Sequence, residues 1–212
     1  MRATEVALTL VSDRRRTPGG DLPALARSAA LAGIDFVQVR EKDLPAGALL
    51  GLVAAVCDSV RGTPARVLVN GRPDVAVLAG ASGVQLPEDG LPVAEVRRAF
   101  GQLLIGASCH SLEAARRAEA AGADFVVLGP VFATPGKQTR ALGAQALAEV
   151  ARVLRVPVHA IGGIDAGTGP LAVAAGAAGL AAIRAFLQAP LPEVARSLRN
   201  ASEQGRAGRV PG

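Results

Sequence analysis

Val158-His159-Ala160-Ile161-Gly162-Gly163-Ile164 and Gly179-Leu180-Ala181-Ala182-Ile183-Arg184 decide the fold of this chain. Each segment is a short apolar run that leads into a helical pattern. The first run ends in two glycines and the second in a cation. This pattern is typical of the last two strands of a (β/α)8 barrel, where the following loops bind a phosphate group. Glycines let backbone N–H groups approach phosphate oxygens, and a helix N-terminus adds a favourable dipole. A plain tight turn is the alternative explanation of the glycine pair.

Short valine-rich runs alternate with longer amphipathic segments along the whole chain. We expect strands at Val6–Asp13, Phe36–Glu41, Arg66–Gly71, Gly83–Pro87, Leu104–His110, Phe125–Phe132, Val158–Gly163 and Gly179–Phe186. We expect helices at Asp21–Ala32, Ala46–Arg61, Pro73–Ala79, Pro92–Phe100, Ser111–Ala121, Gly143–Leu154, Thr168–Ala175 and Pro192–Ser202. These units predict an α/β fold, a single (β/α)8 TIM barrel over residues 1–202, with an open doubly wound sheet as the alternative. Residues 203–212 are polar and glycine-rich, and we expect a disordered tail there.

Composition limits the class of function. Of the 212 residues, 50% are apolar and 2% are aromatic, so Val, Leu, Ile and Ala must build the core. The net charge is +5, but no aromatic residues interleave the basic ones, and we therefore expect no nucleic-acid partner. We expect no membrane partner, because no apolar run has the length of a membrane span and the start lacks a signal-peptide pattern. Cys57 and Cys109 make neither a disulfide framework nor a metal site, which fits a cytoplasmic protein. The oligomeric state stays open, and a homo-oligomer is compatible with the sequence.

The active site of a (β/α)8 barrel lies at the C-terminal ends of its strands. The expected strand ends and loops carry these residues: Gln38, Arg40, Lys42, Asn70, Arg72, Glu88, Asp89, Ser108, His110, Thr134, Gly136 and Lys137. Four cations then surround one mouth of the barrel: Arg40, Lys42, Lys137 and Arg184. This concentration of positive charge predicts a ligand with two anionic groups, or one long anion.

Several linked motifs follow one another along the chain: Gln38-Val39-Arg40-Glu41-Lys42, Asn70-Gly71-Arg72-Pro73-Asp74, Ser108-Cys109-His110-Ser111, Gly129-Pro130-Val131-Phe132-Ala133-Thr134, Lys137 and Gly162-Gly163-Ile164. In these motifs the chain resembles the thiamine phosphate synthase/TenI family of phosphate-binding barrels. The synthases of that family join a pyrimidine methyl pyrophosphate to a thiazole phosphate, with Mg²⁺ held by two aspartates. The resemblance therefore implies a phosphorylated thiazole, and for a synthase also a pyrimidine pyrophosphate, as partners.

The resemblance also implies which residues bind these ligands. Gln38 is among the binding residues, and the pyrophosphate would be surrounded by Arg40, Lys42, Asn70, Ser108 and Lys137. The thiazole phosphate would be surrounded by Thr134, Gly162, Gly163, Ile183 and Arg184. Gly136 stands in the same loop, where the family has a second threonine, so one hydroxyl donor is missing.

The chain departs from the synthase pattern at both metal carboxylates. Gly71 replaces one aspartate, and the second aligns with Gly90, which leaves Asp89 one position early. We therefore expect no cofactor, and expect Mg²⁺, with Asp89 as its ligand, only if the chain is a synthase. Asn70-Gly71-Arg72 and Val84-Gln85-Leu86-Pro87 instead resemble the TenI branch, which includes a metal-independent thiazole tautomerase. The tautomerase is our first hypothesis, the synthase the second, and a non-catalytic binder of phosphorylated ligands the third.

A tautomerase needs a group that transfers a proton near neutral pH. The TenI branch's proposed catalytic histidine corresponds to Pro130 here, so His110 is the candidate, and a structural role in its loop is the alternative. Cys109 should point to the opposite face of its strand, into the core. We expect His159 to be a core histidine with satisfied hydrogen bonds.

Overall fold

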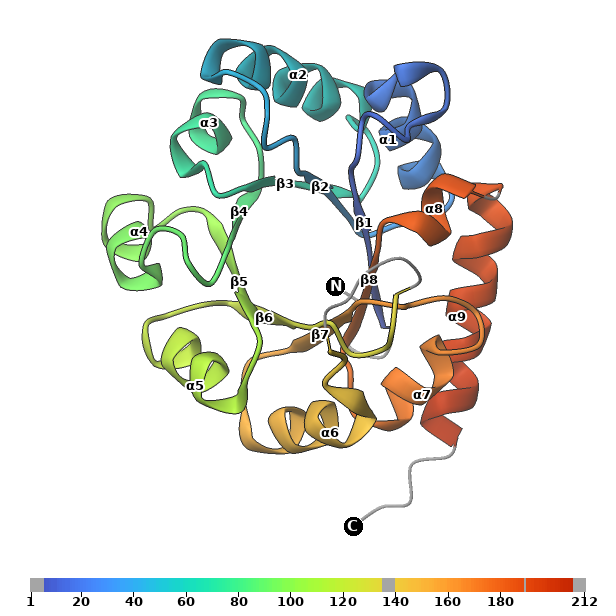
Figure 1. Ribbon diagram of the computed structural model, residues 1–212. Coiled ribbons are helices and arrows are strands. Elements are labelled where there is room, and N and C mark those ends of the chain that lie inside the picture. Colours follow the sequence, from blue (N-terminus) through green and yellow to red (C-terminus); the bar gives the residue numbers. More distant parts are fainter. Residues whose placement is uncertain (1–5, 135–139, 189, 208–212) are drawn as a thin grey trace.

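The fold is a closed parallel barrel surrounded by helices, as the computed structural model describes it for residues 6–134, 140–188 and 190–207 (Figure 1). The strands follow one another around the ring: β1 (Ala7–Val11), β2 (Phe36–Val39), β3 (Arg66–Asn70), β4 (Gly83–Leu86), β5 (Leu104–Cys109), β6 (Phe125–Leu128), β7 (Val158–Ile161) and β8 (Gly179–Ala182). The ring closes because β8 pairs with β1, where Ala7 lies opposite Gly179. This closure confirms the predicted (β/α)8 barrel and excludes the open sheet.

Helices cover the outside of the barrel in chain order. They are α1 (Leu22–Leu31), α2 (Ala46–Ser59), α3 (Pro73–Leu78), α4 (Val93–Ala99), α5 (Leu112–Ala120), α6 (Gly143–Val153), α7 (Gly169–Ala174), α8 (Arg184–Gln188) and α9 (Leu191–Ala207). Glycines with positive φ follow α1, α5 and α7 and connect them to the next strand: Gly33, Gly122 and Gly176. Glycine is common at such helix ends because it adopts the left-handed conformation without a Cβ clash.

Two apolar layers hold the barrel together, because alternate strand residues point to opposite faces. The outer layer lies between strands and helices and includes Val37, Val69 and Leu128. The inner layer fills the barrel and includes two aromatic residues, Phe36 and Phe125. Their rings are stacked, with centroids 6.0 Å apart. The inner layer forms the base on which the pocket described below rests.

His159 belongs to this inner layer. Its side chain is buried, and its ring stacks on Phe125 with a centroid distance of 4.8 Å. The residue is a core histidine as expected, but the prediction of satisfied hydrogen bonds is wrong: within the described residues, Nδ1 has no hydrogen-bond partner. Burial lowers the pKa of His159 to about 4. Gly179 makes room for the ring, since a Cβ there would lie 2.5 Å from His159 Cδ2.

The strands end earlier than expected on the side of the pocket. We expected the last strand to reach Phe186, but β8 ends at Ala182 and α8 begins at Arg184. Pairing between β8 and β1 stops at Ala182 and Leu10, after which the backbone turns away from the sheet. At the other end of the chain, α9 continues to Ala207, past the expected end at Ser202, so that the first part of the expected tail is helical.

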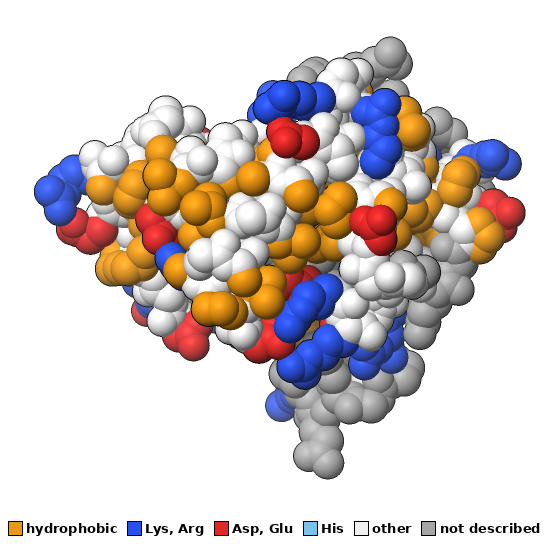
Figure 2. Space-filling view, turned by 90° about the horizontal axis from the view of Figure 1, so that it is seen from above, with side chains coloured by type: hydrophobic (Ala, Val, Ile, Leu, Met, Phe, Trp, Pro, Cys, Tyr) orange, Lys and Arg blue, Asp and Glu red, His pale blue; other side chains and the backbone are white. Residues whose placement is uncertain are grey.

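The outer surface carries exposed apolar side chains between charged ones, as the view onto α2 shows (Figure 2). The exposed positions of α2 are mostly small, among them Gly47, Ala48, Gly51 and Ala55. In the described part of the chain, no helix is both long and apolar enough to cross a membrane.

Candidate active site

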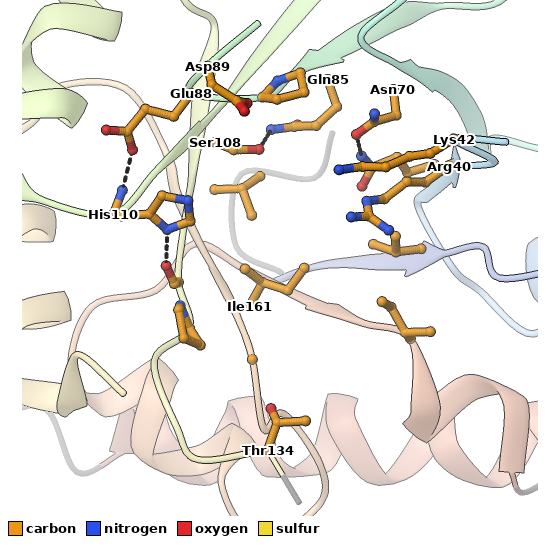
Figure 3. Close-up of a pocket in the computed structure, with 18 residues that line it drawn as sticks. Arg40, Lys42, Asn70, Gln85, Glu88, Asp89, Ser108, His110, Thr134 and Ile161 are labelled. Atoms are coloured by element: carbon orange, nitrogen blue, oxygen red, sulfur yellow. Dashed lines mark hydrogen bonds between the residues drawn. The ribbon is translucent and has the colours of Figure 1, made fainter. Parts of the chain in front are cut away.

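A cavity of about 360 Å³ opens at the C-terminal ends of the strands (Figure 3). Most of the candidate residues line it: Gln38, Arg40, Lys42, Asn70, Asp89, Ser108, His110, Thr134, Gly162 and Ile183. They come from the ends of β2, β3, β4, β5 and β8 and from the loops after β6 and β7. The barrel therefore brings together in one pocket residues that lie far apart in the sequence.

The remaining candidate residues either fall outside the described part of the chain or are described away from the cavity wall. Gly136 and Lys137 are outside the described residues, so their predicted contacts stay predictions. Gly163 and Arg184 are described but are not among the residues that line the cavity. Arg72, which also stands at a strand end, forms a bidentate ion pair with Asp74 on α3. Its Nε donates to Oδ1 at 2.9 Å and its Nη2 donates to Oδ2 at 2.6 Å.

The glycine pair after β7 is required by packing. Gly162 has φ of +96°, and a Cβ there would lie 2.6 Å from Pro130 Cα. A Cβ at Gly163 would lie 2.6 Å from the carbonyl oxygen of Ala133. The loop after β7 thus lies directly against the loop after β6. Gly162 also lines the cavity. The same turn therefore packs against the loop after β6 and borders the pocket with its backbone.

Arg40 and Lys42 are the cations of the cavity wall. Figure 3 shows the two side chains reaching into the pocket side by side from the end of β2. Within the described residues, neither side chain has an ion pair or a hydrogen bond to a protein group. Other arginines nearby are paired: Arg14 binds Asp43, and Arg72 binds Asp74. Two cations without a partner among the described residues, both lining one cavity, suit an anionic ligand.

Two side-chain amides organise the polar groups beside these cations. Gln38 Nε2 donates to Asn70 Oδ1 at 3.2 Å, and Gln85 Nε2 donates to Ser108 Oγ at 3.0 Å. Because Asn70 accepts with its oxygen, its NH₂ group stays available as a donor. Ser108 likewise accepts at its oxygen and keeps its own hydrogen to donate. The pocket therefore offers donors, which suits phosphate oxygens.

His110 and Glu88 stand on the opposite side of the pocket from Arg40 and Lys42 (Figure 3). Glu88 Oε2 accepts the backbone N–H of His110 at 2.8 Å. The ring of His110 contacts the carbonyl oxygen of Gly129 through Nδ1. Cys109, next in the chain, is buried in the outer apolar layer as predicted, and burial raises the pKa of its thiol to about 12. Of this Cys109–His110 pair, only His110 lines the pocket.

Sequence reasoning missed part of the cavity wall. The residues that it did not single out for binding are Val11, Gln85, Val127, Gly129, Pro130 and Ile161. Val11, Gln85, Val127 and Ile161 lie on β1, β4, β6 and β7. They are inward-facing strand residues, so the alternation of side chains along each expected strand was the signal that could have identified them.

Two carboxylate residues line the cavity after β4, Glu88 and Asp89, and they are the candidates for contact with Mg²⁺. Gly71 and Gly90 both lie against Pro87: a Cβ would be 3.6 Å from Pro87 Cδ at Gly71 and 3.1 Å at Gly90. Of these two, Glu88 accepts the backbone N–H of His110 with its Oε2 atom. Among the described residues, no cluster of three or more His, Cys, Asp or Glu side chains is arranged to hold a metal ion. Since Mg²⁺ is often held by one carboxylate together with substrate phosphates, this donor set fits an ion carried mainly by a pyrophosphate, and Asp89 as its protein ligand stays a prediction.

The fold and the site together define a (β/α)8 barrel with a polar pocket at the C-terminal ends of its strands. A family model described as thiamine monophosphate synthase matches residues 8–186, and the chain belongs to this family. It is similar to the thiamine-phosphate synthase of Anaeromyxobacter dehalogenans, with 48% identity over 90% of this chain and 87% of the relative. It is also similar to the thiamine-phosphate synthase of Methanoculleus marisnigri, with 42% identity over 91% and 93%. Among solved structures, a thiamine phosphate pyrophosphorylase from Pyrococcus furiosus matches with a TM-score of 0.86 and 30% identity, over 94% of this chain and 96% of that one.

These findings confirm the family and change the order of the hypotheses. The relatives named above carry the name of the synthase, which was our second hypothesis. The tautomerase, our first hypothesis, receives no specific support from them. The chain is an enzyme of the thiamine phosphate synthase family, and the synthase reaction is the better supported of the two activities.

Proposed function

We propose that this protein is a thiamine-phosphate synthase that joins a pyrimidine methyl pyrophosphate to a thiazole phosphate. The observation that carries the proposal is one cavity with two cations on one side and the loops after β6 and β7 on another. Arg40, Lys42 and Asn70 line one wall, and the loops with Thr134 and Gly162 line another. Two phosphorylated substrates that meet in one pocket need this arrangement, and the names of the relatives supply their chemical identity.

The residues of the first wall would act on the leaving group. The ring nitrogen of the thiazole forms a bond to the methylene carbon of the pyrimidine, and the carbon–oxygen bond to pyrophosphate breaks. The pyrophosphate leaves with the electron pair of that bond, so negative charge grows on the bridging oxygen. Arg40 and Lys42 stabilise this charge, and Ser108 donates a hydrogen bond that Gln85 orients. Positioned cations and donors of this kind lower the barrier because they need no reorganisation during the reaction.

Mg²⁺, when bound, neutralises part of the charge of the pyrophosphate. Asp89 is the residue of this chain that would hold it. The two cations share the same task, which offsets the replacement of the other carboxylates by Gly71 and Gly90.

The direct test is synthesis from the two substrates. The purified protein is incubated with the pyrimidine pyrophosphate, the thiazole phosphate and Mg²⁺, and thiamine phosphate is measured after oxidation to its fluorescent product. We expect repeated turnover with one pyrophosphate released for each thiamine phosphate. A folded protein that binds thiazole phosphate but makes no product would refute the synthase and leave the tautomerase and the non-catalytic binder.

A second activity, thiazole tautomerisation, is favoured by one observation in the same pocket. The Nδ1 of His110 faces the carbonyl oxygen of Gly129, and Figure 3 shows the other ring nitrogen turned toward the cavity. A backbone carbonyl only accepts hydrogen bonds, so the ring hydrogen lies on Nδ1 and the nitrogen on the cavity side can take up a proton. This arrangement suits proton transfer on a thiazole ring held by its phosphate.

A further inference from the structure

Glu41 stands between the two pocket cations in the sequence but is turned away from them. Arg40 and Lys42 line the cavity, whereas the Glu41 side chain is only 4% exposed and lies against the loop that follows β1. Alternate residues of an extended segment point to opposite sides, which separates the carboxylate from its two neighbours. A buried carboxylate is costly unless its oxygens are bound, so the groups that bind Glu41 decide whether it stays there.

Ser12 connects this carboxylate to the backbone of Arg40. The Ser12 hydroxyl donates to Glu41 Oε1 at 2.5 Å, since a carboxylate can only accept. The same hydroxyl oxygen accepts the backbone N–H of Arg40 at 2.9 Å. The backbone N–H of Ser12 in turn donates to the carbonyl oxygen of Gln38 at 2.9 Å. One buried serine therefore fixes the point at which the chain leaves β2 and carries Arg40 into the pocket.

Arg14 balances the charge of Glu41 from the same loop. Its backbone N–H donates to Glu41 Oε1 at 3.1 Å, and its guanidinium lies 3.3 Å from Oε2. The guanidinium also binds both oxygens of Asp43, at 2.5 and 2.7 Å. Arg15 adds a contact to Asp43 at 2.8 Å. The two acidic residues that flank Lys42 in the sequence are thus both held by the loop after β1.

This arrangement has an electrostatic consequence for the pocket. If Glu41 were released, its carboxylate would be close in the chain to Arg40 and Lys42 and would compete with an anionic ligand for them. While Ser12 and Arg14 hold it, both cations stay without an ion pair in the described part of the chain. The loop after β1 makes no phosphate contact of its own in this scheme.

We propose that Ser12 and Glu41 are positioning residues, which aim the Arg40–Lys42 pair into the pocket and keep it available for the pyrophosphate group of the substrate. The inference rests on the proposed role of Arg40 and Lys42 in binding that group. It differs from the synthase proposal in that it concerns anion binding alone, which inorganic pyrophosphate reports without any turnover.

The test is a double-mutant cycle read by calorimetric titration with inorganic pyrophosphate. We expect Ser12→Ala to weaken pyrophosphate binding about tenfold, because the Arg40 backbone and the Glu41 carboxylate both lose a partner. In the Arg40→Ala background, the same substitution should weaken binding less than it does in the wild type, since Ser12 acts in part through Arg40 and in part by keeping Glu41 away from Lys42. Arg15→Ala is the matched control: it removes a cation from the same loop without touching Ser12 or Glu41, and affinity should stay unchanged. Ser12→Thr, which keeps the hydroxyl, should restore most of the affinity.

The outcomes separate the possibilities. Equal weakening by Ser12→Ala in both backgrounds would overturn the proposal, and so would unchanged affinity in a variant that keeps its melting temperature. If Ser12→Ala does not fold, Arg14→Ala takes its place, because it removes the guanidinium that binds Glu41 and keeps the carboxylate, and its effect should also be smaller in the Arg40→Ala background. Wild-type protein that binds no pyrophosphate would also overturn it. Protein that binds pyrophosphate with the expected coupling but makes no thiamine phosphate would refute the synthase proposal alone.

Discussion

The imidazole of His110 is fixed by the carbonyl oxygen of Gly129, which lies 2.5 Å from Nδ1. The contact joins the end of β5 to the end of β6, and Glu88 holds the backbone N–H of His110 from the other side. An imidazole held in this way presents one defined nitrogen to the pocket, in one tautomer. The same pocket contains Arg40 and Lys42, which have no ion pair in the described part of the chain, so that proton transfer and pyrophosphate departure would use different residues.

The His110→Asn variant separates these two activities. We expect thiamine phosphate formation to stay close to the wild-type rate, because departure of pyrophosphate needs no proton acceptor. We expect thiazole tautomerisation, measured by incorporation of solvent deuterium into the thiazole, to fall by about 10²-fold or more. Undiminished exchange in the folded variant would remove His110 from the tautomerase reaction. A large loss of thiamine phosphate formation would instead assign His110 to the synthase.

Lys42→Ala tests the anion-binding wall during turnover. Lys42 has no protein partner in the described residues, so its removal should leave stability unchanged while the pyrimidine pyrophosphate loses a charged contact. We expect KM for that substrate to rise about tenfold, and less at high salt, where the charge is screened. Arg61→Ala is the control, because Arg61 is an exposed cation that pairs with Asp58 on α2 and lies outside the cavity wall. An equal rise of KM in both variants would indicate a general effect of net charge.

The barrel was predictable because it depends on local periodicity. Short apolar runs separated by amphipathic segments determine which residues form strands, and all eight expected strands are present. Their C-terminal ends were not predictable, because apolar residues continue beyond the last paired position. After β6, for example, Val131 is fully buried although it lies beyond the strand, where its N–H donates to the carbonyl oxygen of Ile161. Burial continues in the loop while strand pairing does not.

The candidate site was predictable where side chains alternate along one strand, as with Gln38, Arg40 and Lys42. The sequence does not reveal with which group a polar side chain forms its hydrogen bonds or ion pairs. Arg72 was expected at the mouth of the barrel but pairs with Asp74, two residues further on. Ser12 was not expected near the site at all, because its contact with Glu41 depends on the pairing of β1 with β2.

Gly71→Asp should return a carboxylate to the neighbourhood of Asp89. The nearest atom to a Cβ at Gly71 is Pro87 Cδ at 3.6 Å, so the side chain has room. The backbone φ is +68°, a conformation that costs an aspartate about 1 kcal/mol in the free energy of unfolding. We expect tighter Mg²⁺ binding in the presence of pyrophosphate, measured by calorimetric titration, and a small drop in melting temperature.

Gly80→Asp is the matched control for this change. Gly80 has φ of +70° and open space around its Cβ position, but it follows α3 and does not line the cavity. It should lose the same stability without any gain in Mg²⁺ affinity. Equal Mg²⁺ affinity in the two variants would show that position 71 does not face the bound pyrophosphate.

Protonation of His159 should make the barrel sensitive to acid. Burial lowers its pKa to about 4, below the ordinary value of 6.5, so the folded protein keeps this ring neutral. As the pH falls below 6.5, the unfolded chain takes up the proton and the folded chain does not. The free energy of unfolding therefore decreases between about pH 6.5 and pH 4, by about 3 kcal/mol in total from this one group.

The His159→Leu variant should lose this part of the acid sensitivity. Leucine fits the apolar surroundings of Phe36 and Phe125, and it removes a buried nitrogen that has no partner within the described residues. We expect the difference in free energy of unfolding between pH 7 and pH 4.5, from urea titrations, to shrink by about 2 kcal/mol relative to wild type. His110→Asn, which retains His159, should keep the wild-type difference. If His159→Leu keeps it too, the acid sensitivity comes from the carboxylates, and His159 is hydrated or paired in solution.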